Sequence, residues 1–580
     1  MCMLAVRLLV LALVFVAGAT SQETEVDSQK TYPIGEVVVT ATRGRIPLKD
    51  SPSQMDIIDE DDLQNINGGT VADALQHESS LFVKQYGPNG ALRTLSMRGG
   101  ASEHVLVLVD GNRVNSFQNG LVDLSLFPLN DVDRIEVLHG GSSALYGADA
   151  LGGVVNILTR APGSGLHVRT EAATGSFGLE RYLIESRGRT GRIGLVAGYA
   201  SERGRDDFRY DIVSSSGGDT TVTRENSDFF RRQMYLHTSI SPYEHASINS
   251  SIQYVVADRG TPSPFSPSAR QSDDDLHCSL GFNRIDGDGT GWNFVAGFHY
   301  ALQDYNDPNP SFPYHTFYKN IYASVNPQIR LRLGEYQVVT AGGEMSQGTL
   351  DSPDFDSKVT RVQKSVYVTG ESRIEFDNQL FNLILLYQSI RYDLISDVDF
   401  AVTPKAGINV RLASVGDIRL RGSIGESFRS PSFNDLYYRG FSNPALRPER
   451  STSFDAGFSA AFTLLGENSL EYTYFHQDID SRILFDPSTY LPMNIGKVLS
   501  VGSEVKYAGS FIRRKLDVKV NYSFTDARKR NLDFPGDPAF DRQLVYIPGD
   551  VFNASFGFTM EPLRINITHS IVGSRFLTSD

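Results

Sequence analysis

Two short groups of residues carry side chains of the types that enzymes use. His104 and Asp110 lie close together in the sequence and could exchange protons with a substrate. No nucleophile with a positioned base accompanies them, as a catalytic site would require. Residues Gly140–Ser143 have the composition of a phosphate-binding loop, but the Gly-Lys-Ser/Thr that completes such a loop does not follow. We therefore expect no catalytic residues and no enzymatic activity.

A third group is acidic and could bind a metal ion. Its carboxylates lie in the segment 206–228 and belong to Asp206, Asp207, Asp211, Asp219, Glu225 and Asp228. Hard cations such as Ca²⁺ take several oxygen ligands, so this segment could hold a structural calcium ion. The spacing matches no fixed motif, and a solvated, charge-rich loop is the alternative. No cofactor is expected to be required.

The composition excludes two classes of protein. A net charge of -14 at pH 7 argues against nucleic acid as a partner. After residue 20 the chain has no run of roughly eighteen apolar residues, which excludes membrane-spanning helices. The 26 Tyr, 34 Phe and 52 Gly residues instead suit many strands and turns, because rings pack on pleated surfaces and glycine allows tight turns.

Residues 1–19 have the form of a signal peptide. Arg7 precedes an apolar core, Leu8–Val16, and the small residues Ala17–Ala19 follow. We expect an exported protein cleaved after Ala19. A membrane anchor is the alternative, but the apolar core is too short to span a bilayer. Removal of Cys2 would leave Cys278 as the single cysteine, so no intramolecular disulfide is expected.

Residues 20–52 form a lead ahead of the first domain. The polar, acidic stretch 20–33 cannot bury enough surface to order itself. A β-branched run follows it and comprises Ile34, Gly35, Glu36, Val37, Val38, Val39, Thr40 and Ala41. A strand on a tether can add an edge to another protein's sheet through main-chain hydrogen bonds. By the residues alone, an ordinary first strand of the next domain is an equal alternative.

Residues 53–160 read as a small α+β domain. Short strands are expected near Met55 and at Val105–Val109, where five consecutive apolar residues indicate burial on both faces. Thr70–Asp73 is a capping-box-like helix start. The segment 132–159 then combines a strand, a glycine turn, a short helical piece and a second buried strand. Such a compact unit belongs in a globular domain.

From residue 161 to 580 the chain alternates apolar and polar residues. Ile248, Ile252 and Tyr254 share one face of a segment while Ser251 and Gln253 share the other, and similar segments recur to the end. Strands of ten or more residues without a core helix are typical of a membrane β-barrel with a wet lumen rather than of a soluble sandwich. We expect a membrane all-β fold: a large antiparallel transmembrane barrel.

Two motif blocks resemble the TonB-dependent outer-membrane transporters. The first covers residues 92–159 and includes Ser96–Gly100 and the segment 132–159; the second covers Phe428–Tyr437 and Asn443–Arg450. The resemblance implies that 53–160 is a plug inside the barrel lumen and that 34–41 is a TonB box, which binds TonB acting with ExbB and ExbD. It also implies an outer-membrane location in a Gram-negative-type bacterium and energy-coupled uptake of a scarce large chelate.

The chain looks most like the cobalamin receptors, although iron-siderophore receptors share both motif blocks. Similar cobalamin receptors carry an acidic loop where segment 206–228 lies. In this family, ligands bind plug apices and outer loops, and the matching apex residues are Tyr86, Gly87, Pro88, Asn89, Asn115, Ser116, Phe117, Gln118 and Asn119. The alternative is a passive outer-membrane porin, which would need neither a plug nor a tethered box.

The expected strand count is about nineteen, against 22 in plugged outer-membrane transporters. An odd count leaves the first and last strands unable to pair antiparallel, and unpaired main-chain groups in hydrocarbon cost several kcal/mol each. The chain stops after Leu577–Asp580, in what should be a loop. We therefore expect about three strands, some 45 to 60 residues, to be missing beyond residue 580.

Overall fold

The computed structural model describes residues 37–38, 43–44, 46–66, 68–213, 219–263, 266–287, 289–378, 380–413, 417–486, 489–532, 537, 539–560 and 562–577. The expected signal peptide, most of the lead and residues Ile34–Glu36 and Val39–Ala41 lie outside these residues. None of the described helices is long and apolar enough to cross a membrane.

The plug is built on a five-stranded sheet with the order β3-β8-β9-β6-β7. Its strands are β3 (Met55–Ile58), β8 (Val132–His139), β9 (Gly153–Thr159), β6 (Val105–Val109) and β7 (Asn112–Arg113). β6 pairs parallel with β9, whereas the other neighbours are antiparallel. All five residues of β6 are buried, as its unbroken apolar sequence predicts.

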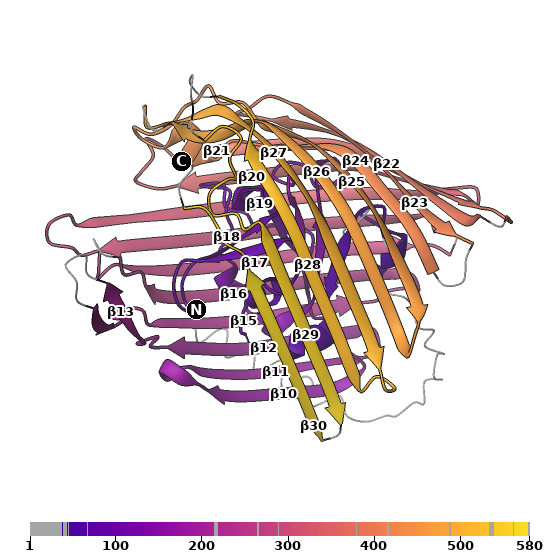
Figure 1. Ribbon diagram of the computed structural model, residues 1–580, viewed down its shortest axis with the longest axis horizontal. Helices are drawn as coiled ribbons and strands as arrows, with labels where there is room; N and C mark the ends of the chain where they lie inside the picture. Colours follow the sequence, from indigo (N-terminus) through magenta and orange to yellow (C-terminus); the bar gives the residue numbers. More distant parts are fainter. Residues whose placement is uncertain are drawn as a thin grey trace.

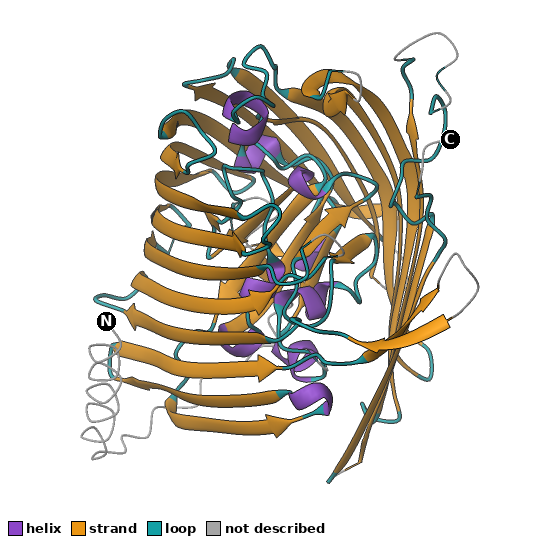
Figure 2. Cartoon of the chain, turned by 90° about the vertical axis from the view of Figure 1, so that its left-hand side faces the viewer, coloured by secondary structure: helices purple, strands orange, loops and turns teal. Residues whose placement is uncertain are grey.

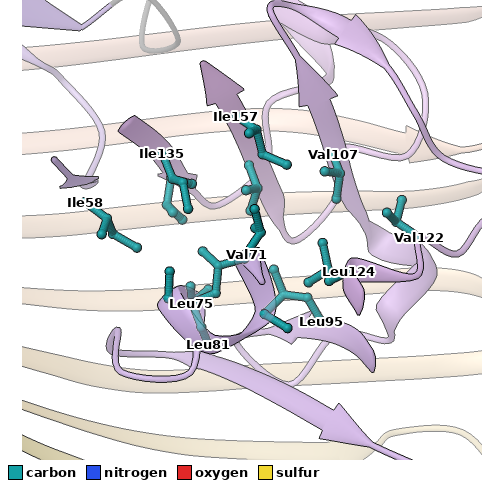
Figure 3. Packing of buried hydrophobic residues seen from close by; sticks show 14 of the residues in the cluster. Ile58, Val71, Leu75, Leu81, Leu95, Val107, Val122, Leu124, Ile135 and Ile157 are labelled. Carbon is teal, nitrogen blue, oxygen red and sulfur yellow. The ribbon is translucent and has the colours of Figure 1, made fainter. Parts of the chain in front are cut away.

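Short helices and a hairpin complete the plug. They are η1 (Leu48–Asp50), α2 (Glu60–Gln64), α3 (Val71–Leu75), β4 (Leu81–Gln85), β5 (Arg93–Met97), η2 (Ser102–His104), η3 (Leu124–Leu126), η4 (Leu129–Asp131) and α4 (Ser143–Tyr146). The expected capping box at Thr70 is present, because Asp73 accepts hydrogen bonds from the Thr70 main chain and hydroxyl. Val71, Leu75, Val107 and Ile135 meet in the main plug core (Figure 3).

Within the described residues, nineteen strands form one continuous sheet, the expected number, and each is antiparallel to its neighbours. In order they are β10 (Gly165–Thr174), β11 (Glu180–Thr190), β12 (Ile193–Gly204), β15 (Phe229–Ile240), β16 (Ala246–Gly260), β17 (Arg270–Ile285), β18 (Gly291–Asp307), β19 (Tyr314–Leu333), β20 (Gln337–Asp351), β21 (Val359–Glu375), β22 (Phe381–Ile395), β23 (Ala401–Leu412), β24 (Asp417–Arg429), β25 (Glu449–Thr463), β26 (Gly466–Asp486), β27 (Leu491–Phe511), β28 (Leu516–Lys529), β29 (Asp550–Met560) and β30 (Leu563–Val572).

The sheet curves around the plug, which is indigo in Figure 1, and the plug helices lie within that curve in Figure 2. β10 and β30 end the strand order and do not pair with each other in the described part of the chain. Among the described residues after 160, four short elements stand outside the large sheet: β13 (Arg209–Val213) and β14 (Asp219–Thr223), which form a hairpin, η5 (Ser176–Gly178) and α5 (Phe433–Tyr437).

Alternation along the strands turns polar side chains inward and apolar ones outward. In β16, Ser251 and Gln253 are buried toward the plug, whereas Ile252 is 45% exposed on the opposite face. A soluble sheet would show the reverse, with its apolar face buried. This pattern suits a barrel whose outer face meets lipid and whose lumen is polar.

Candidate functional site

The predicted TonB box is described only at Val37 and Val38, which form β1. β1 pairs antiparallel with β2 (Ile46–Pro47), so Val38 lies opposite Ile46. The remaining box residues lie outside the described residues. Binding of the box to TonB stays a prediction.

Arg43, which follows the predicted box, is held between the plug and the barrel wall. Its side chain is 7% exposed and contacts Glu344 of β20 at 3.4 Å. The guanidinium lies 4.9 Å from the ring centre of Tyr146 in α4 and 4.5 Å from that of Tyr367 in β21. Such cation–π contacts strengthen when they are shielded from water. Sequence reasoning did not find this contact, because the basic residue gave no sign of its partner in β20.

Arg98 joins the plug to another part of the wall. Its Nε donates to Glu504 of β27 at 2.7 Å, its Nη1 to Asp455 of β25, and its Nη2 to Gln54 at 3.0 Å. The guanidinium also lies over the ring of Phe475, 4.7 Å from its centre. Buried carboxylates are tolerated when they are paired in this way. Arg98 lies in a motif that the sequence singled out, but its acidic partners are hundreds of residues away.

Asp56 forms another plug–wall contact. Its carboxylate is 2.7 Å from Nε2 of His139 and also pairs with Lys506 of β27. Burial alone would raise the pKa of Asp56, but Lys506 and His139 hold it well below its usual range. Its charged form therefore stabilises the folded protein above the usual Asp pKa, and this contribution is lost only in strong acid, as pH falls through the depressed pKa.

The pKa of Glu78, which lies just after α3, is shifted in the opposite direction. Burial and the neighbouring Asp56 raise the pKa of its carboxyl to about 7, although Lys506 and Lys519 act against this. A carboxyl with a raised pKa is destabilised in its charged form. The plug therefore contains two carboxyl groups near Lys506 whose pKa values shift in opposite directions: the pKa of Asp56 is lowered and that of Glu78 is raised.

The first predicted apex, Tyr86 to Asn89, lies in the loop between β4 and β5. Tyr86 is 61% exposed. Asn89 donates to Asp206 of the barrel at 3.2 Å, and Arg259 of β16 donates to the carbonyl of Gly90 at 3.0 Å. These two hydrogen bonds attach the loop to the barrel, while the Tyr86 ring stays accessible.

The second predicted apex, Asn115 to Asn119, is packed against the barrel. Asn115 is buried: its Oδ1 accepts from the Val107 amide at 2.8 Å, and its Nδ2 donates to the carbonyls of Val105 and Gly120 at 3.0 Å. Ser116 accepts from the Gln118 amide, and Asn119 from the Leu121 amide. These polar groups shape the loop itself, so contact with a ligand remains a prediction for them.

Phe117 belongs to an aromatic cluster that the sequence did not predict. Its ring centre is 5.7 Å from that of Phe433 in α5 and 5.6 Å from that of Tyr322 in β19. The amide of Phe433 donates to the Phe117 carbonyl at 2.9 Å, and the amide of Asn434 to the Gln118 carbonyl at 2.8 Å. The rest of the cluster comprises Tyr318, Leu350, Phe355, Val359, Tyr437 and Tyr438. The plug apex and α5 therefore form one unit.

Residues of the second motif block, Phe428–Tyr437 and Asn443–Arg450, pair with one another and with the plug. Arg429 donates to Glu449 at 3.0 Å and to Asp435 at 3.2 Å. Glu449 also lies 2.6 Å from Nε2 of His104, with both side chains almost fully buried. His104 is therefore a structural contact, and Asp110 accepts from Thr159 and Ser251 instead. The two signatures meet in space although they are far apart in the chain.

The acidic segment 206–228 does not gather its carboxylates. Asp228 pairs with Arg270 at 3.0 Å, Asp211 accepts from Thr221 at 2.6 Å, and Asp206 accepts from Asn89. Asp207 lies 3.8 Å from Arg205, Glu225 is exposed, and Asp219 begins β14. No group of three or more His, Cys, Asp or Glu that could hold a metal ion occurs among the described residues. Calcium binding stays a prediction that this geometry does not support.

Comparisons with known proteins agree with this architecture. The family described as "TonB dependent receptor-like, beta-barrel" matches residues 170–580, and the "TonB-dependent Receptor Plug Domain" family matches residues 47–154. The chain is 25% identical to the vitamin B12 transporter BtuB of Photobacterium profundum over 562 residues, which cover 93% of this chain and 85% of that protein.

Solved structures show the same fold. The siderophore receptor PirA from Pseudomonas aeruginosa matches with a TM-score of 0.68 at 18% identity and 90% coverage of both chains. The ferric yersiniabactin uptake receptor FyuA from Yersinia pestis matches with a TM-score of 0.72 at 14% identity, covering 91% of this chain and 87% of that one. At these identities the structural likeness concerns the fold alone.

Proposed function

Because the chain belongs to the TonB-dependent receptor family, we propose that it is an outer-membrane receptor for energy-coupled uptake of a large chelate. The chelate is a cobalamin or a ferric siderophore, and cobalamin is the first candidate, because the curated relative is named a vitamin B12 transporter. TonB, acting with ExbB and ExbD, is the periplasmic partner. The predicted box at 34–41 is its binding segment, through strand addition.

The observation that carries the proposal is the way the plug is held. Contacts reach it from separate parts of the wall: Arg98 pairs with β25 and β27, Arg259 of β16 pairs with Asp123, and Arg419 of β24 pairs with Asp50. These ion pairs are buried, and breaking one by removing a single partner costs several kcal/mol. Because these pairs close the lumen and are costly to break, moving the plug to let a ligand pass would need an input of energy.

The outer side of the plug offers the surface for the ligand. Tyr86 provides an exposed ring, and the cluster around Phe117 places further rings beside the second apex. Aromatic rings contribute large contact areas with little loss of conformational entropy, which suits a bulky, partly planar chelate. We propose that Tyr86 contacts the ligand directly, while Phe117 and Phe433 hold the second apex in place.

A binding screen tests the proposal. The refolded 580-residue chain is titrated with cyanocobalamin and with ferric catecholate and ferric hydroxamate chelates, and heat is measured by calorimetry. We expect one of these ligands to bind with a Kd of about 1 μM or less, equivalent to about -8 kcal/mol. Failure of all of them to bind would contradict the proposal.

The porin alternative has its own test. A passive pore conducts steadily in a planar bilayer, whereas a plugged barrel should not. We expect no steady conductance from the purified chain, and a stable open channel would favour the porin.

A further inference from the structure

Two histidines face each other on the inner wall of the barrel. His277 of β17 and His299 of β18 are directly paired across the two antiparallel strands. Their side chains are buried, with 2% and 7% exposure, and their ring centres are 6.0 Å apart. Directly opposed residues have Cβ atoms about 5 Å apart, so their side chains can reach a common atom.

The ring nitrogens of His277 lack hydrogen bonds. Both Nδ1 and Nε2 are buried and have no hydrogen-bond partner among the described residues. An unsatisfied buried polar group costs about 1–3 kcal/mol, and native structures seldom leave one without a reason. His277 therefore has a nitrogen lone pair that the surrounding protein does not use.

His299 is oriented by a carboxylate. One ring nitrogen, Nε2, lies 2.9 Å from Oδ2 of Asp275, which is on the same strand as His277. A histidine that binds a metal ion usually donates its other ring N–H to a carboxylate or carbonyl, and this hydrogen bond sets the tautomer. The contact with Asp275 would place the proton on Nε2 and leave the Nδ1 lone pair available.

We propose that His277 and His299 together bind one divalent transition-metal ion of the zinc, nickel or copper(II) class. Imidazole nitrogen is a preferred ligand for these ions. With metal–nitrogen bonds of about 2.0–2.1 Å, two imidazoles on one ion have ring centres roughly 4.5–6.4 Å apart, depending on the angle between the two bonds at the metal. The observed separation of 6.0 Å falls in this range.

Water completes the coordination in this proposal. No third His, Cys, Asp or Glu joins the pair to make a set of three within the described residues. His237 of β15 also has ring nitrogens without hydrogen bonds, but it lies 3.5 Å from Asp131 of the plug. The site adjoins the second plug apex, because His299 is paired across β18 and β19 with Tyr322, whose ring centre is 5.6 Å from that of Phe117. Neither histidine is itself an apex residue.

Metal binding to the refolded full chain tests the inference. After treatment with EDTA and its removal, the chain is titrated with Zn²⁺ and with Ni²⁺ in a calorimeter. We expect one equivalent to bind, a loss of at least tenfold in affinity in His277→Ala and in His299→Ala, and a loss of about 10–100-fold in Asp275→Asn. The control is His315→Ala, since His315 is exposed and paired with Asp304; its affinity should stay within twofold of wild type.

A spectroscopic measurement on the wild-type chain covers the case in which these variants fail to fold. With one equivalent of Cu²⁺, electron paramagnetic resonance should resolve coupling to two nitrogen ligands. Absence of saturable binding, binding retained in a folded His277→Ala/His299→Ala double variant, or a Cu²⁺ spectrum without two nitrogen ligands would each overturn the inference.

Discussion

Arg98 is the residue whose loss should weaken the contact between plug and wall most. It is 3% exposed and pairs with two buried carboxylates. In Arg98→Met, Asp455 and Glu504 would lose their cationic partner, which should lower the free energy of unfolding by about 3–5 kcal/mol. The measurement is denaturant unfolding of the refolded chain. Arg284→Met is the control, because its pair with Asp286 is exposed and should contribute less than about 1 kcal/mol.

Glu78 should make the stability of the plug depend on pH. Its pKa is raised from 4.5 to about 7 in the folded protein. Between these pH values the folded protein keeps a proton that the unfolded chain releases, so the Glu78 contribution to stability falls as pH rises. In Glu78→Gln this fall, roughly 1–3 kcal/mol, should disappear. Unfolding free energies at pH 5 and pH 8 check this prediction. The control is Glu335→Gln, since Glu335 is exposed in the turn between β19 and β20. An unchanged dependence of stability on pH in Glu78→Gln would contradict the prediction.

Tyr86 should matter for binding and little for folding. Its ring is exposed, so Tyr86→Ala should leave the unfolding midpoint unchanged while raising the Kd for the chelate found in the screen by about tenfold, as loss of ~1.5 kcal/mol of aromatic contact would. The control is Tyr243→Ala, since Tyr243 is exposed in the turn between β15 and β16. Equal affinity in wild type and Tyr86→Ala would place the site on other loops.

For single residues, the sequence predicted which residues are important better than it predicted the partners that they contact. Arg98 and Phe117 stand in motifs that sequence reasoning identified. Their partners Glu504 and Phe433 lie far along the chain, and no local pattern connects them. Phe117 was expected to present its ring to a ligand; the structure packs the half-buried ring against the barrel and α5, and its contact with a ligand stays a prediction. A period of two shows which face a side chain takes, but not which residue it meets there.

Among the elements, β1 is the one on which coupling to TonB should depend. Proline at Val38 removes a main-chain donor and distorts strand pairing. In Val38→Pro, uptake of the chelate should stop while its binding at the outer face persists. The control Val38→Ile keeps a β-branched side chain and should transport normally. Measured uptake in cells and binding in the purified protein separate the two effects, and normal uptake by Val38→Pro would remove the coupling hypothesis.

Elements with a strong repeating pattern were the most predictable. The alternation of polar and apolar residues predicted about nineteen strands, and nineteen join in the large sheet of the described residues. β6 was recognised by its unbroken apolar run. α5 was not expected, because Phe433–Tyr437 is too short to show a helical period. Its helix is instead stabilised by the Ser432–Asp435 capping box and by the aromatic cluster.

For the whole molecule, the central claim is that a plug-filled barrel moves its ligand only when energy is supplied through TonB. The sequence supported the architecture, because both motif blocks and the barrel pattern were present. The ligand was not predictable, since cobalamin receptors and siderophore receptors share these motifs.

The most direct test is uptake of radiolabelled cyanocobalamin and of ferric chelates by cells that lack their own receptors and express this chain, with TonB present or deleted. The account predicts accumulation of one of these chelates only when both this chain and TonB are present. Accumulation at the same rate without TonB would contradict it.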